Sequence, residues 1–146
     1  MATLDPPRTR PVWLTGALAG ITASAATELY GLIAHAAGIP MAAGNIGAAK
    51  TGPITLGMFA MGTLICTFWG TILAMLLARY ANRPARMFAR TAVVLTAISL
   101  AGPLAAGATA TSTKLMLAVA HLIAAAIIIP VLSRRLARRP DRRVPA

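Results

Sequence analysis

Four long apolar runs, separated by short polar segments, dominate the pattern of the chain. A helix needs about 20 mostly apolar residues to cross a bilayer, and shorter runs suffice where polar residues flank them. Because lipid offers the backbone no hydrogen bonds, each run is expected to be a helix. The pattern therefore predicts an all-α, polytopic membrane protein, a four-transmembrane-helix bundle that forms a single domain over residues 1–146. The helices are predicted at residues 12–37, 54–77, 90–106 and 114–132, followed by a basic C-terminal tail at 133–146.

The arginines gather on one side of the predicted helices. They occupy the N-terminal arm, the segment between the second and third runs, and the tail, whereas the other two connections carry only Lys50 and Lys114. Because Lys and Arg near helix ends stay on the cytoplasmic side, both termini are expected to be cytoplasmic in a multi-pass protein of the cell membrane. This topology and contact with anionic lipid headgroups explain the formal net charge of +11. Nucleic acid is therefore not an expected partner, although clustered arginine also neutralises phosphate.

The first run also has features of a cleavable signal peptide. Arg8 and Arg10 precede a short apolar stretch, and residues 23–25 have the small-residue pattern of a signal-peptidase site. Cleavage would leave three helices and an external N-terminus. The helical pattern continues past the site and ends at residues 38–40, which favours an uncleaved first helix.

Small residues recur at helical spacing along the first run. Positions four apart lie on one helix face, and two glycines at this spacing let helix backbones approach closely. We therefore predict a helix-packing face made of Gly16, Gly20, Ser24 and Gly31. Its partner is another helix of the chain, a second copy in a homo-oligomer or an unknown membrane protein. Helix kinks are predicted at Pro103 and Pro130, because proline has no N–H to donate within a helix.

Two ionisable residues fall inside the predicted spans at matching depth. Glu28 and His121 each lie about eight or nine residues from the outer ends of their runs, or some 12–14 Å at about 1.5 Å per residue. Intramembrane charges are expensive, so such residues usually face the bundle and pair. We therefore expect a buried polar pair between Glu28 and His121. The pair would serve as a structural hydrogen bond, which we favour, or as a proton relay.

Other chemistry finds little support in the sequence. Cys66 is the only cysteine and is expected to be a small buried residue. A methionine stripe in the second run is better explained by lipid or core contact than by a soft metal. Haem held by His35 and His121 is disfavoured, because the two differ in depth by about 9 Å. With no paired carboxylates, activated nucleophile or phosphate-binding loop, we predict no catalytic residue, no metal, no cofactor and no enzymatic activity.

Several segments of the chain resemble an uncharacterised family of small four-helix membrane proteins from high-GC bacteria. These segments are residues 99–104, with Gly102 before Pro103, residues 117–130, where His121 precedes an alanine run, and residues 38–40. The resemblance spans most of the chain and does not include Glu28. It implies the four-helix fold and a bacterial inner membrane, and it implies no activity.

The function predicted from the sequence is that of an integral membrane protein of unknown biochemical role. It would be a structural or accessory subunit, packed through its small-residue helix faces. The alternative is a small proton-coupled transporter that uses Glu28 and His121. The two hypotheses differ in whether Glu28 changes its protonation state during a working cycle.

Overall fold

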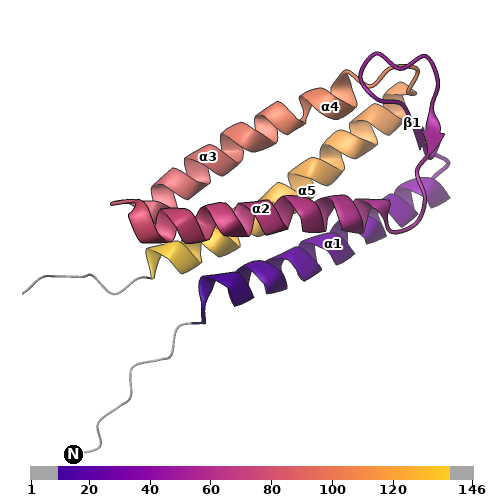
Figure 1. The fold of residues 1–146 in the computed structure, drawn as a ribbon. Coiled ribbons are helices and arrows are strands. Elements are labelled where there is room, and N and C mark those ends of the chain that lie inside the picture. Colours follow the sequence, from indigo (N-terminus) through magenta and orange to yellow (C-terminus); the bar gives the residue numbers. More distant parts are fainter. Residues whose placement is uncertain (1–9, 139–146) are drawn as a thin grey trace, which may run out of the picture.

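The structure of the protein, a computed structural model, describes residues 10–138. Four helical spans in the described residues are long and apolar enough to cross a membrane, and one of them, Pro84–Leu104, consists of two successive helices. This confirms the predicted four-helix bundle of a multi-pass membrane protein. The arginines before residue 10 and after residue 138 lie outside the described residues. The elements are α1 (Val12–Ala36), β1 (Ala42–Ala43), β2 (Gly52–Pro53), α2 (Met58–Tyr80), α3 (Pro84–Ser99), α4 (Ala101–Leu104) and α5 (Thr111–Ala137) (Figure 1).

The helix boundaries differ from the ends of the apolar runs for local reasons. α2 begins only at Met58, because Gly57 has a φ of 89°, a conformation that favours glycine. α3 begins at Pro84, ahead of its apolar run, because proline is well tolerated in the first turn of a helix. Arg90 is helical and exposed, since its long side chain can carry the charge to water. An apolar run therefore marks the lipid-facing part of a helix and not its ends.

In this bundle the buried side chains are mostly small, and many large apolar side chains are exposed. Most buried side chains are small ones of alanine, serine and threonine, whereas Ile21, Phe68 and Trp69 are 62%, 61% and 63% exposed. In water such an apolar surface would promote aggregation. Lipid tails solvate it instead, and close packing of small residues then holds the helices together. The distribution is typical of helices that span a membrane.

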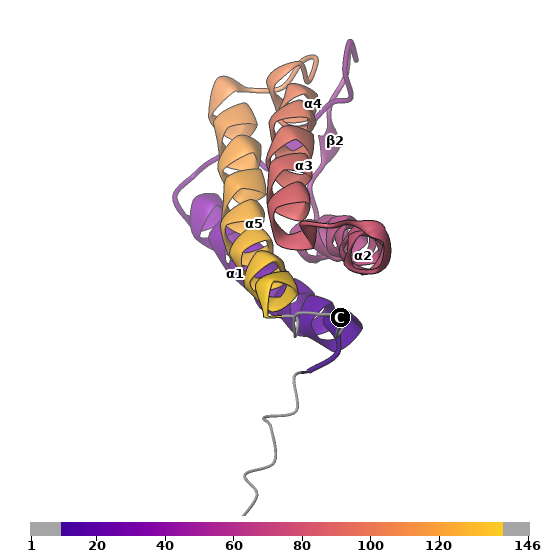
Figure 2. The same cartoon turned by 90° about the vertical axis from the view of Figure 1, so that its left-hand side faces the viewer.

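The helices are arranged so that α1 lies against both α2 and α5, while α3 packs mainly on α5. In the view of Figure 2, α3 and α5 lie side by side, and α2 lies beside the N-terminal end of α3. The two figures together show that α2 and α3 are close at the 81–83 turn and diverge away from it. The start of α1, this turn and the end of α5 share one end of the bundle, where the Arg135 Nε–H donates to the Arg10 carbonyl oxygen.

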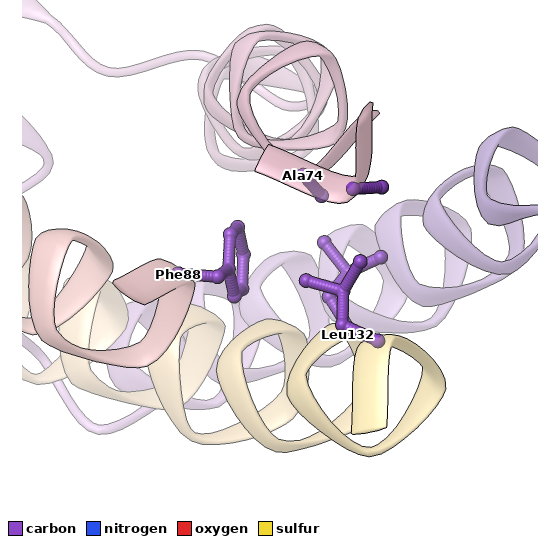
Figure 3. Close-up of a cluster of buried hydrophobic side chains, with 5 residues drawn as sticks. Ala74, Phe88 and Leu132 are labelled. Atoms are coloured by element: carbon purple, nitrogen blue, oxygen red, sulfur yellow. The ribbon is translucent and has the colours of Figure 1, made fainter. Parts of the chain in front are cut away.

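A hydrophobic cluster fastens the bundle at this same end. Phe88 of α3 is buried beside Ala74 of α2 and Leu132 of α5, and Ala78 and Leu136 complete the cluster (Figure 3). Three spans therefore meet through a large aromatic side chain at the place where they converge.

Two loops close the opposite end through main-chain hydrogen bonds. β1 pairs antiparallel with β2, which the apolar runs do not reveal. The Gly44 N–H donates to Thr109 Oγ1 (2.8 Å), and the Gly107 N–H donates to the Asn45 carbonyl oxygen (2.9 Å). A Cβ on Gly44 would overlap the Gly107 carbonyl oxygen. The loops 37–57 and 105–110 therefore form one cap over the bundle.

Candidate functional site: a polar seam between α1 and α2

The glycine face of α1 packs against a threonine face of α2. Thr67 and Thr71 are buried one turn apart on α2. A Cβ on Gly16 would overlap the Thr71 side chain, and a Cβ on Gly20 would lie 2.9 Å from Thr67 Cγ2. Larger residues at these positions would force the helices apart, so the close approach of the two backbones requires glycine. The face predicted from the sequence thus meets another helix of the same chain.

Hydroxyl groups add hydrogen bonds across the same contact. The hydroxyls of Thr27 and Thr63 are bonded at 3.0 Å in buried surroundings, and Ser24 Oγ donates to the Ala60 carbonyl oxygen at 3.2 Å. An interhelical bond of this kind contributes about 0.6 kcal/mol on average within a membrane. We refer to the whole contact as the α1–α2 seam. From α1 it contains Gly16, Gly20, Ser24, Thr27 and Glu28, and from α2 and its N-cap it contains Gly57, Ala60, Thr63, Thr67 and Thr71.

Glu28 binds the N-terminus of α2 with both of its carboxylate oxygens. The Gly57 N–H donates to Oε1 at 2.7 Å, and the Ala60 N–H donates to Oε2 at 3.0 Å. The first N–H groups of a helix have no partner within the helix, and the helix dipole favours a negative charge beside them. α2 has no side-chain cap from its own N-cap residue, Gly57. Glu28 therefore caps α2 from the neighbouring helix.

His121 has a different partner from the one that the sequence predicts. Its Nδ1 lies 2.7 Å from the Leu117 carbonyl oxygen on its own helix, to which an Nδ1–H donates. Within residues 10–138, no hydrogen bond or ion pair joins Glu28 to His121. At matching depth the two side chains are not hydrogen-bonded to each other, because the start of α2 supplies the donors to Glu28. His35 lies in the last turn of α1 and is exposed.

Two further predictions concern the ends and the outer face of these helices. Gly31 is buried against the ring of Phe59, where a Cβ would lie 2.8 Å from a ring carbon, so this glycine also meets α2. Cys66 is exposed, and the expectation that it is buried was wrong. It precedes Thr67 by one position, which turns it away from the threonine face of α2.

The two prolines occupy different settings. Pro103 is buried in α4, and regular helix is interrupted just before this short element, at Leu100. Since proline has no N–H, the Ser99 carbonyl loses its usual donor. Pro130 lies inside α5, which continues as a helix to Ala137.

The threonine face of α2 was not identified from the sequence, although the spacing of the threonines indicates it. Thr63, Thr67 and Thr71 follow one another at the same steps of four as Gly16 and Gly20. Matching these two stripes would have paired the two helices. The cap formed by Glu28 has no such signal, because it depends on where the loop before α2 returns to the bundle.

The polar groups of the seam join two helices. Its carboxylate is engaged by two main-chain donors. Across the part of the chain that the structure describes, no group of three His, Cys, Asp or Glu is placed to hold a metal ion.

Four apolar spans, two of them joined by a polar seam, define the class of the molecule as a multi-pass helical membrane protein. The chain belongs to DUF6069, a family of unknown function, which it matches over residues 7–138. Membership of an uncharacterised family is thereby confirmed, while the restriction to high-GC bacteria stays a prediction. No curated protein and no solved structure matches the chain.

Proposed function

We propose that the protein is a non-enzymatic structural or accessory subunit of a membrane assembly. The observation that carries this proposal is the double hydrogen bond from the start of α2 to Glu28. A proton-carrying carboxylate has to gain and lose a proton as it works. In this structure both oxygens of Glu28 accept hydrogen bonds from main-chain N–H groups of the neighbouring helix, which hold the side chain in place. A fixed carboxylate that orients α1 against α2 fits a structural role.

A second feature supports a partner in the membrane. Trp69 lies at the middle of α2, is 63% exposed and stacks edge to face on Phe68, with ring centroids 5.5 Å apart. Tryptophan prefers the membrane interface, because its indole N–H needs a hydrogen-bond acceptor. A partner helix that offers an acceptor at mid-membrane would satisfy this group.

Affinity purification of the tagged full chain from its native membrane, in mild detergent, tests the accessory role. We expect a partner in fixed stoichiometry with the wild-type protein, reduced by Trp69→Phe and retained by Trp13→Phe. Trp13 is a matched control, since it is 58% exposed and lies at the start of α1. Purification of a monodisperse chain without any partner, or equal loss with both variants, would contradict the proposal.

The transporter alternative is tested separately in liposomes that contain the purified protein and a pH-sensitive dye. We expect an imposed pH gradient to decay at the same rate with wild-type protein and with Glu28→Gln. A faster decay with wild-type protein that Glu28→Gln abolishes would favour proton coupling through this residue.

We also propose that the shared end of the bundle, with the 81–83 turn, faces the cytoplasm of the cell. The concentration of arginine at this end supports the orientation. Reporter fusions after residue 81 and at the C-terminus should read cytoplasmic, and fusions near Ala48 and Thr111 should read external. An external C-terminal fusion would reverse the assignment.

A further inference from the structure

A groove runs between α3 and α5. It is open along its length and has a volume of about 630 Å³, which falls within the roughly 300–1,000 Å³ of small-molecule sites. Its lining residues belong to these two helices, except Leu100, which directly follows α3, and three of them are the small residues Ala97, Ala125 and Ala126. Alanine side chains leave more space between two helices than larger residues would.

The wall of the groove is almost entirely apolar. The lining contains one hydroxyl, that of Thr96, and this hydroxyl donates to the Ala92 carbonyl oxygen at 2.8 Å. The lining residues of the span Pro84–Leu104 extend from Val93 to Leu100, or about 10 Å along the helix axis. Since the other lining side chains are apolar, the groove suits a hydrocarbon chain.

One end of the groove is positively charged. Arg90 lies three residues before Val93, and Arg134 lies four residues after Pro130, so each arginine shares a helix face with the lining. α3 and α5 run in opposite directions (Figure 1), which brings both arginines to the same end. Both are exposed. Ser133 directly precedes Arg134, and its Oγ is buried without a hydrogen-bond partner in the described residues.

We propose that this groove is a binding site for one anionic phospholipid. An acyl chain lies along Ala97, Ala125 and Ala126, and the headgroup phosphate binds between Arg90 and Arg134. Arginine binds phosphate through charge-assisted, often bidentate hydrogen bonds. The site is independent of the accessory role proposed above and requires only that α3 and α5 span a membrane.

The charges favour a lipid over a second copy of the chain as the occupant. A helix of a second copy in this groove would bring its own arginines to the same membrane face, and like charges would oppose each other there. An anionic lipid supplies both the hydrocarbon and the opposite charge. Anionic headgroups at the cytoplasmic surface gain about 1 kcal/mol per nearby arginine, or about fivefold in affinity for each.

The first test uses the wild-type full chain in nanodiscs that contain a phosphatidylglycerol with a photoreactive group near the end of one acyl chain. After illumination, mass spectrometry of peptides locates the labelled residues. We expect labelling concentrated on residues 93–100 and 122–130, and reduced severalfold when phosphatidylcholine carries the same acyl chain. Labelling spread evenly over the exposed faces of α1 and α2, or equal labelling by the two lipids, would overturn the proposal.

The second test compares matched variants in the same labelling assay. Ala97→Leu fills the groove and Arg90→Gln or Arg134→Gln weakens the headgroup site, so each should reduce groove labelling by about fivefold or more. Ala25→Leu and Arg79→Gln make the same changes at exposed positions of α1 and α2 and should leave the labelling unchanged. Equal effects of site and control variants would show that only general surface charge attracts the lipid. The wild-type labelling map decides the proposal even if a variant fails to fold.

Discussion

The two interfaces α1–α2 and α3–α5 solve the same packing problem in different ways. In the α1–α2 seam, glycines of one helix receive threonines of the other, and hydroxyl and carboxylate hydrogen bonds join them. Between α3 and α5, three alanines are among the residues that line an open groove. Since lipid removes the hydrophobic force between helices, small residues alone do not guarantee a tight contact. The comparison teaches that a small residue gives close helix packing only where a side chain of the opposite helix fills the space beside it.

The largest expected effect comes from Gly16→Leu. Even a Cβ at this position overlaps Thr71, and overpacking of this kind typically costs about 3 kcal/mol. We expect the apparent melting temperature of the detergent-solubilised protein to fall by many degrees, and that of Gly20→Leu to fall less. Ala17→Leu, at the neighbouring exposed position, should be tolerated. Equal tolerance of Gly16→Leu and Ala17→Leu would mean that the α1–α2 seam is not tightly packed.

Glu28→Leu should rank next. It leaves the N–H groups of Gly57 and Ala60 without their acceptors, and a buried unsatisfied group costs about 1–3 kcal/mol. Glu28→Gln keeps one acceptor oxygen and should cost about half as much. A reversible unfolding measurement in mixed detergent micelles can determine both values.

The same measurement separates the two partners considered for Glu28. Because the carboxylate bonds α2 and not His121, the costs of Glu28→Leu and His121→Leu should add to within about 0.5 kcal/mol in the double variant. A double variant more stable than Glu28→Leu alone would instead support the pairing expected from the sequence.

A smaller effect is expected within the hydroxyl contacts of the seam. Thr27 and Thr63 hydroxyls are bonded to each other at 3.0 Å, and interhelical bonds of this type average about 0.6 kcal/mol in membranes. A double-mutant cycle with Thr27→Val and Thr63→Val should therefore return a coupling energy near this value. A coupling of zero would leave the glycines, and not the hydroxyls, as the source of the seam's stability.

The sequence predicts the spans better than it predicts what joins them. Hydropathy locates all four helices, because burial of the backbone in lipid requires long apolar segments. The spacing of Gly16 and Gly20 likewise identifies a face that lies against another helix. The partner of Glu28 could not be predicted, since the first turn of α2 reaches it only after the chain has folded back through the loop 38–57. Depth within a membrane is one coordinate, and contact depends on rotation and on the path of the loops as well.

The smallest effect is expected from Ala97→Leu, which makes the comparison between the two interfaces direct. Ala97→Leu adds less side-chain volume than Gly16→Leu does. The added volume also enters an open groove, whereas at Gly16 it enters a closed contact. We expect a change in the free energy of unfolding within about 0.5 kcal/mol, the range of substitutions that create neither strain nor a cavity. Destabilisation as large as that of Gly16→Leu would show that α3 and α5 close around Ala97 in the membrane. The difference between the two interfaces would then disappear, because both would be tightly packed.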